Sequence, residues 1–90
     1  MRDDRFDLQL FGVHYDEYSL RALKQSIARN QKQLEEHRDK MNNPWNYVSD
    51  WENRGEAYQK GIVSYWRKEV ENFKNQIRLA KEELDRRDKE

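Results

Sequence analysis

The stretch VSYWRKEVENFKNQIRLAKEEL, residues 63–84, decides the fold of this 90-residue chain. Its apolar side chains return at alternating intervals of three and four residues, the period that sets one face of an α-helix against a partner helix. These positions are Val63, Trp66, Val70, Phe73, Ile77, Ala80 and Leu84. The stretch therefore predicts a long helix with one packing seam.

A matching seam comes earlier in the chain and carries polar residues at two of its positions. Its members are Leu20, Leu23, Ile27, Asn30, Leu34, His37 and Met41. The sequence Asn42-Asn43-Pro44 ends this helix, because the residue before a proline avoids the helical conformation. Two matched seams joined by a short connection predict an all-α fold, an antiparallel two-helix hairpin of coiled-coil type.

The expected organisation is an extended N-terminal arm over residues 1–15 and a helical hairpin domain over residues 16–90. Within the hairpin we expect a helix over residues 16–41, an aromatic connection over 42–55 and a helix over 56–88. The first helix is expected to begin at Asp16, because Tyr15 and Leu20 flank it as a hydrophobic staple flanks an N-cap.

The start of the second helix has two solutions. The sequence Ser49-Asp50-Trp51-Glu52 has the spacing of a capping box, which would start a continuous helix at Asp50. Gly55 and Gly61 would each destabilise such a helix by about 1 kcal/mol relative to alanine. A short helix that ends near Arg54, followed by the long helix, is the alternative.

Composition narrows the class of protein. Hydrophobic residues make up 34% of the chain and charged residues 40%, which suffices for a thin seam and predicts further burial by oligomerisation or a partner. Eighteen basic residues balance eighteen acidic ones, so net charge provides no attraction for nucleic acid or an anionic membrane. The chain has no cysteine. We expect no cofactor, no nucleic-acid partner and no membrane partner.

The segment Phe6-Asp7-Leu8-Gln9-Leu10-Phe11-Gly12 alternates apolar and polar residues, which is the period of an extended strand. A lone strand needs cover for its apolar face, which this chain, a second copy or another protein could provide. Phe6, Leu8, Leu10 and Phe11 are therefore candidate contact residues.

The same FDLQLFG segment resembles an opening common among proteins encoded by phages and prophages of Firmicutes, especially in head and other structural gene clusters. The resemblance covers seven of the ninety residues. It implies a phage or prophage context, and hence the cytoplasm of the bacterial host or a virion as the location.

Aromatic residues are dense around the connection. Trp45, Trp51 and Trp66 are expected to plug the turn end of the hairpin. Tyr58, Ile62 and Tyr65 form a second stripe beside the seam of their helix, and one partner helix cannot cover both. Trp and Tyr dominate protein interfaces. The predicted partner-binding residues of this half of the chain are Trp51, Tyr58, Ile62 and Tyr65.

No arrangement typical of catalysis is present. His14 and His37 lie 23 positions apart, without the placement that a helical metal site uses. The paired acids Glu35-Glu36 and Glu82-Glu83 fall on charge-balanced outer faces. The basic residues Arg21, Lys24, Arg29 and Lys32 are interpreted as a solvated face.

We therefore expect a non-enzymatic protein-protein interaction module that forms homo-oligomers or binds a phage or host protein. The first hypothesis is a small structural or assembly component of a phage or prophage. The alternative is a small phage inhibitor or regulator of a host defence or toxin protein, which would act through the aromatic stripe.

Overall fold

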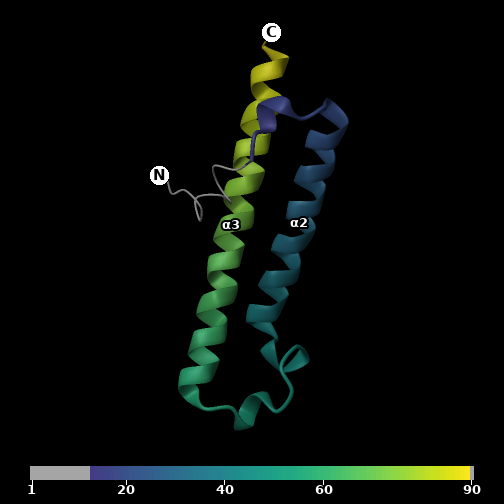
Figure 1. Ribbon diagram of the computed structural model, residues 1–90. Coiled ribbons are helices and arrows are strands. Elements are labelled where there is room, and N and C mark those ends of the chain that lie inside the picture. Colours follow the sequence, from purple (N-terminus) through teal and green to yellow (C-terminus); the bar gives the residue numbers. More distant parts are fainter. Residues whose placement is uncertain (1–12, 90) are drawn as a thin grey trace.

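Residues 13–89 of the computed structural model are described below. Their elements are the 3-10 turn η1 (Tyr15–Glu17), helix α2 (Leu20–Asn42), the 3-10 turns η2 (Pro44–Asn46) and η3 (Trp51–Asn53), and helix α3 (Glu56–Asp88). Helices α2 and α3 run antiparallel, and the connection crosses one end of the pair (Figure 1). The predicted all-α two-helix hairpin is confirmed. The predicted N-terminal arm lies outside the described residues, apart from its last three.

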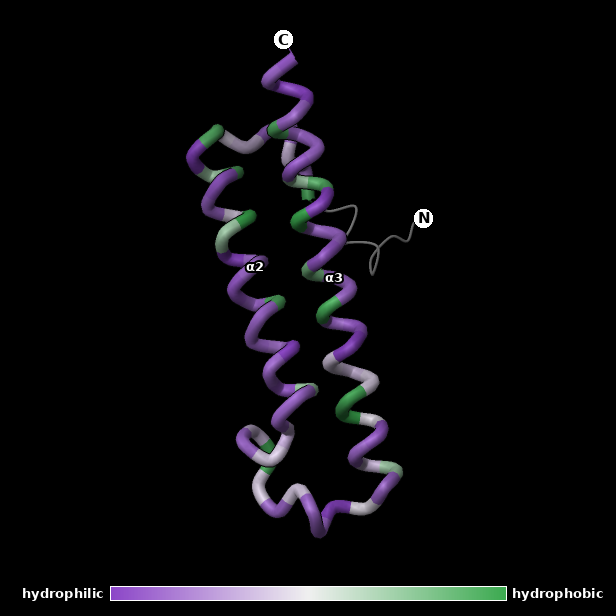
Figure 2. The backbone as a smooth tube through the Cα atoms, turned by 180° about the vertical axis from the view of Figure 1, so that it is seen from behind, coloured by the Kyte–Doolittle hydropathy of each residue, from purple (hydrophilic) through white to green (hydrophobic). Residues whose placement is uncertain are grey.

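The predicted seams form the contact between the helices. Leu23 and Leu34 of α2 and Trp66, Val70 and Ala80 of α3 are buried. Figure 2 shows the hydrophobic segments of the two helices turned toward each other. Leu20 is the exception at 51% exposed, because Tyr15 and Tyr18, rather than the first residue of α2, contribute to the core at this end.

The first α-helix begins at Leu20, four residues later than predicted, and Asp16 is not its N-cap. The Ser19 side chain accepts a hydrogen bond from the Ala22 backbone N–H at 3.1 Å, so Ser19 satisfies one of the free donors at the helix start. Tyr18 is extended, with φ −78° and ψ 144°. Asp16 lies instead inside η1, whose Tyr15 is buried.

Helix α3 begins at Glu56 with Gly55 as its N-cap. The possible start at Asp50 is wrong, because Asp50 has left-handed backbone angles, φ 55° and ψ 38°, which no α-helix can continue through. The short turn η3 follows at Trp51–Asn53. The alternative of a short helical segment before the long helix describes this connection correctly.

The turn η1 caps the open end of the hairpin. Tyr15 forms a buried cluster with Leu23 and Ala80, and Val13, Tyr18, Ile27, Leu79 and Leu84 pack around it. The Tyr15 hydroxyl donates a hydrogen bond of 2.6 Å to Gln76 Oε1 on α3. Two helices alone enclose little core, so η1 adds the third wall that buries this end.

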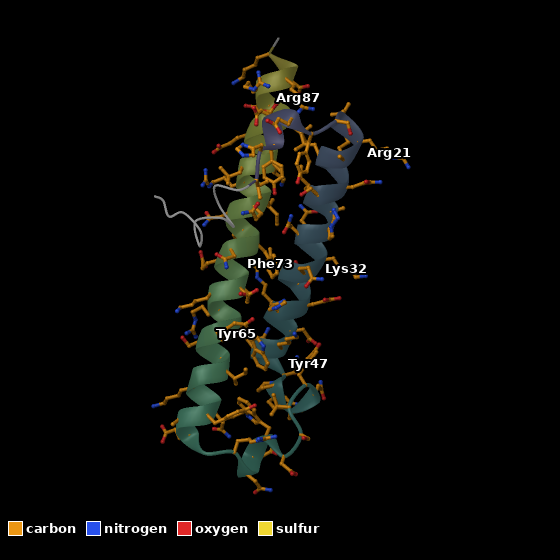
Figure 3. The ribbon with its side chains drawn as sticks, in the orientation of Figure 1. Arg21, Lys32, Tyr47, Tyr65, Phe73 and Arg87 are labelled. Carbon is orange, nitrogen blue, oxygen red and sulfur yellow. The ribbon has the colours of Figure 1, made fainter. Side chains whose placement is uncertain are left out.

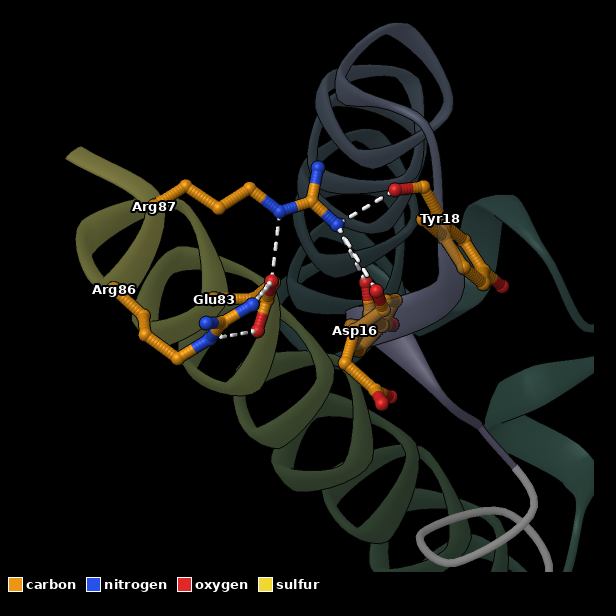
Figure 4. Close-up of polar contacts among 6 residues, drawn as sticks. Asp16, Tyr18, Glu83, Arg86 and Arg87 are labelled. Atoms are coloured by element: carbon orange, nitrogen blue, oxygen red, sulfur yellow. Dashed lines mark hydrogen bonds and ion pairs between the residues drawn. The ribbon is translucent and has the colours of Figure 1, made fainter. Parts of the chain in front are cut away.

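Arg87 fastens η1 to the last turns of α3 (Figure 4). Its Nη2 atom donates to the backbone carbonyls of Tyr18 at 2.6 Å and Tyr15 at 3.1 Å, with Asp16 O at 3.5 Å. Its Nε atom donates to Glu83 Oε2 at 2.7 Å. We call this group, formed by Glu83, Arg87 and the three carbonyls, the Arg87 clasp.

Candidate protein-contact surface

Three of the predicted contact residues share one side of α3, beside the seam that packs against α2. Tyr58, Ile62 and Tyr65 are spaced by four and three residues, so they lie in one row along the helix. Tyr58 is 44% exposed and Tyr65 is 56% exposed, while Ile62 is half-buried. We call these three residues the Tyr flank. Large exposed aromatic side chains in a row are typical of a surface that binds another protein.

The same row continues along α3 to residues that another part of the chain covers. At the same helical spacing, the residues of this row that follow Tyr65 are Glu69, Asn72, Gln76 and Leu79. Gln76 accepts the hydrogen bond from Tyr15, and Leu79 packs against the cluster of Tyr15. The turn η1 therefore covers the row at the open end of the hairpin and leaves its other end, the Tyr flank, exposed.

Trp51 does not belong to this surface. It is half-buried and lines a small hollow of 430 Å³ with Gln59, Lys60, Val63 and Arg67. Successive helical residues are about 100° apart, so positions 60 and 67 lie on one side of the seam residue Val63 and positions 58, 62 and 65 lie on the other. Trp51 was predicted as a contact residue together with the Tyr flank, and the structure places it beside residues on the other side of Val63.

The connection also differs from the prediction that three tryptophans plug the turn. Trp66 is buried, but Trp45 is 53% exposed, and Pro44 is the buried residue of η2. Beside Trp45, Tyr47 is exposed and its hydroxyl donates a hydrogen bond to Asp39, which raises the pKa of Tyr47. The prediction missed Tyr47 as an exposed aromatic residue.

Arg54 is the charged residue fixed at the edge of the Tyr flank. Its guanidinium lies over the Tyr58 ring, 5.0 Å from the ring centroid, at a distance where the cation and the ring attract. Its Nε atom donates to the Ser49 carbonyl at 3.2 Å. These two contacts hold a positive charge next to exposed aromatic surface.

The two polar residues of the α2 seam, Asn30 and His37, have their polar partners within the hairpin. Asn30 donates to the Ser26 carbonyl at 2.8 Å within α2. A ring nitrogen of His37 lies 2.9 Å from the Gln33 carbonyl, and the ring meets Phe73 edge to face at 5.0 Å. Both residues thus have partners within the chain.

The strongest electrostatic effect is at Glu83, away from the Tyr flank. Hydrogen bonds from Arg86 and then Arg87 lower the pKa of this buried carboxylate to about 2. Residues 13–89 contain no group of three or more histidine, aspartate or glutamate side chains that could hold a metal ion. The Glu83 charge is thus paired with two arginines, of which Arg87 also holds η1 in place.

The other face of the hairpin has an open groove of 1030 Å³ between α2 and α3. Leu34 and Ile77 lie among charged residues there, including Lys74, Arg78 and Glu82. Arg78 and Glu82 pair with each other at 2.8 Å. Figure 3 shows Arg21 and Lys32 directed away from α3, where the predicted basic face is exposed to solvent.

The remaining predicted contact residues, Phe6, Leu8, Leu10 and Phe11, lie outside the described residues. Within the described part of the chain, no helix is both long and apolar enough to cross a membrane. Comparisons of this chain with protein-family models, with curated proteins and with solved structures found no match.

Proposed function

We propose that this chain is a non-enzymatic protein-contact module, a small structural or assembly component encoded by a phage or prophage. The observation that carries the proposal is the Tyr flank, whose tyrosines remain exposed on a rigid helix although η1 covers the same row at Gln76 and Leu79. Exposed tyrosine on a rigid element binds a partner with little loss of side-chain entropy. The resemblance of residues 6–12 to openings of phage structural-cluster proteins supports the phage context.

The hairpin suits an assembly role because its contact surface needs no rearrangement. Tyr58 and Tyr65 lie on a continuous helix of 33 residues, and α3 is packed against α2 by Trp66 and Val70 on the adjacent side. A surface prepared in this way binds without the cost of ordering a segment.

The test uses a bacterial strain that carries the gene within a phage or prophage and produces particles. The variant Tyr58→Asp/Tyr65→Asp places two charges on the Tyr flank. The matched control Ser64→Asp/Gln31→Asp adds the same charge at exposed positions elsewhere on the two helices. Circular dichroism of each purified chain checks that the helices persist.

We expect mass spectrometry to find the chain in purified particles or assembly intermediates, and we expect the tyrosine variant to reduce particle yield or incorporation while the control does not. A chain absent from all such particles, with yield unchanged by its deletion, would refute the structural role. That result would direct the next test to the alternative of a regulator of a host protein.

A further inference from the structure

Gly61, in the middle of the Tyr flank, has no close neighbour in the hairpin that would require a glycine there. Gly61 lies inside α3, is exposed, and has ordinary rather than left-handed backbone angles. Apart from its chain neighbours and the adjacent turns of the helix backbone, no atom lies within 4 Å of a Cβ atom built on it. Glycine inside a helix costs about 1 kcal/mol relative to alanine. The advantage that remains for glycine here is to let another backbone approach closely.

The residues around Gly61 are arranged symmetrically in the sequence. Tyr58 and Tyr65 lie at equal separations on either side of the midpoint between Gly61 and Ile62. Arg54 and Glu69 also lie at equal separations from that midpoint. A two-fold axis through the midpoint would therefore set Tyr58 opposite Tyr65 of a second, antiparallel α3. Arg54 precedes α3, in extended backbone, but its guanidinium lies over the Tyr58 ring. Glu69 lies one helical turn beyond Tyr65, so the same axis brings the Arg54 guanidinium toward Glu69 of the second copy.

The charges in this arrangement are complementary. Arg54 is positive and held against the Tyr58 ring, while Glu69 is half-buried on the same side of α3. Among residues 13–89, neither Arg54 nor Glu69 takes part in an ion pair within its own chain, as the ion pairs of α3 involve other residues. The two-fold arrangement gives each of them a partner of opposite charge, twice per dimer.

We propose that the occupant of the Tyr flank is a second copy of the chain. The two α3 helices cross antiparallel at Gly61 and Ile62, each Tyr58 meets Tyr65 of the second copy, and each Arg54 meets Glu69 of the second copy. The proposal rests on the proposed function, since it names the partner of the same surface. It goes further in fixing the symmetry, the register and the residue pairs.

The fold and the antiparallel crossing both limit this contact to the half of α3 near the connection. The turn η1 and Tyr15 already occupy the same row at Gln76 and Leu79. The antiparallel crossing directs the C-terminal half of each α3 away from the axis, so the two capped ends lie far apart. A contact of a few turns is at the small end of protein interfaces, which predicts a weak dimer that dissociates on dilution.

The test is sedimentation equilibrium of the purified full-length chain over a wide concentration range, with charge-reversal variants. Arg54→Glu and Glu69→Arg each set like charges opposite each other at both ends of the contact. We expect each single variant to weaken the dimer by about tenfold or more. The double variant Arg54→Glu/Glu69→Arg restores opposite charges, and we expect it to recover most of the wild-type affinity.

Two further variants separate this contact from others. Gly61→Leu places a bulky side chain at the crossing, and we expect it to abolish the dimer while circular dichroism shows an intact hairpin. Arg78→Glu reverses a charge that lines the groove on the other face, and we expect the dimer affinity to stay unchanged.

A wild-type chain that stays monomeric at the highest concentration would overturn the inference. A dimer in which the double reversal is no tighter than the single variants would overturn it equally, because the residue pairs would then be wrong. Neither result decides the proposed function, which is judged by the presence of the chain in particles and by the effect of Tyr58→Asp/Tyr65→Asp there.

Discussion

Replacing Arg87 with methionine should loosen the open end of the hairpin by removing the Arg87 clasp. The methionine keeps the apolar stem of the side chain and loses the guanidinium that bonds the carbonyls of Tyr15 and Tyr18 at 3.1 and 2.6 Å. Glu83 keeps its hydrogen bonds from Arg86 at 3.0 and 2.6 Å. The variant therefore removes the link between α3 and η1 without leaving the Glu83 carboxylate unpaired.

The expected cost follows from these bonds. A hydrogen bond that involves a charged group contributes about 1.5–3 kcal/mol, and the Arg87 side chain is 24% exposed, so solvent screens it only in part. Its two shorter bonds share one guanidinium and one turn, and their contributions do not add. We expect the free energy of unfolding to fall by about 2 kcal/mol.

The matched control is Arg78→Met. Arg78 forms an ion pair at 2.8 Å with Glu82, which lies one turn further along α3. The Arg78 side chain is 57% exposed, and the pair connects α3 to no other element. Exposed pairs of this kind contribute about 0.3–0.5 kcal/mol. The difference between the two variants thus isolates the bonds to η1 from the general loss of an arginine on α3.

Urea unfolding followed by far-UV circular dichroism measures both variants. A loss of about 2 kcal/mol lowers the midpoint by about 1–2 M urea for a chain of this size, whereas Arg78→Met should move it little. Hydrogen exchange should show that amides near residues 15–18 lose protection first. Equal midpoints for the two variants would refute the reasoning, since the clasp would then contribute no more than a surface ion pair.

Three further predictions concern single positions. The pKa of Glu83 is lowered from 4.5 to about 2, so its contribution to the free energy of unfolding is complete above pH 4.5 and is lost as the pH falls to 2. The stability advantage of the wild type over Glu83→Gln should therefore vanish across that pH range. A constant difference between the two proteins would contradict this prediction. Gly61→Ala should raise the free energy of unfolding of the monomer by about 1 kcal/mol, measured by thermal melts of dilute protein. A decrease in the free energy of unfolding would show that position 61 has no room for a methyl group. Ser19→Ala should lower the free energy of unfolding by about 1 kcal/mol, while Asp16→Ala at the predicted but incorrect N-cap should cost less.

The seams could be predicted because they depend on periodicity alone. A three-four spacing that persists from Val63 to Leu84 leaves little choice but a helix with one packed side, and Trp66, Val70 and Ala80 are buried as that spacing requires. The sequence left two starts open for the second helix. Of its two glycines, Gly55 marks the observed start as the N-cap, whereas Gly61 lies inside α3.

The start of α2 could not be predicted from local pattern. Asp16 and Ser19 are both suitable N-caps, and the sequence around Asp16 has the stronger pattern. The choice is made by Tyr15, whose burial against Ala80 and hydrogen bond to Gln76 draw η1 away from the axis of α2. Those contacts join residues more than sixty positions apart, which no short sequence window contains.

The Arg87 clasp could not be predicted from the sequence, for a similar reason. Glu83 and Arg87 have the four-residue spacing of many exposed ion pairs, and the sequence offers several such pairs on α3. The pair becomes structural only because η1 lies beside it and presents three carbonyl oxygens to Arg87. Identical spacing thus gives a surface pair at Arg78 and Glu82 and a tertiary anchor at Arg87.

The two ends of the same row on α3 differ in how much the chain itself covers, and this difference supports the proposal of a partner at the exposed tyrosines. At the open end the chain uses η1 and the Arg87 clasp to cover Gln76 and Leu79, so apolar surface on this side of α3 is worth covering even at the cost of ordering a turn. At the other end Tyr58 and Tyr65 stay exposed, and the residue between them is a glycine that weakens the helix. For a lone hairpin, polar residues and alanine would be more stable at these positions. This difference between the two ends is what our proposal of a second copy on the Tyr flank explains, with the Arg54 guanidinium beside Tyr58 and Glu69 one turn beyond Tyr65 as the charges that would meet.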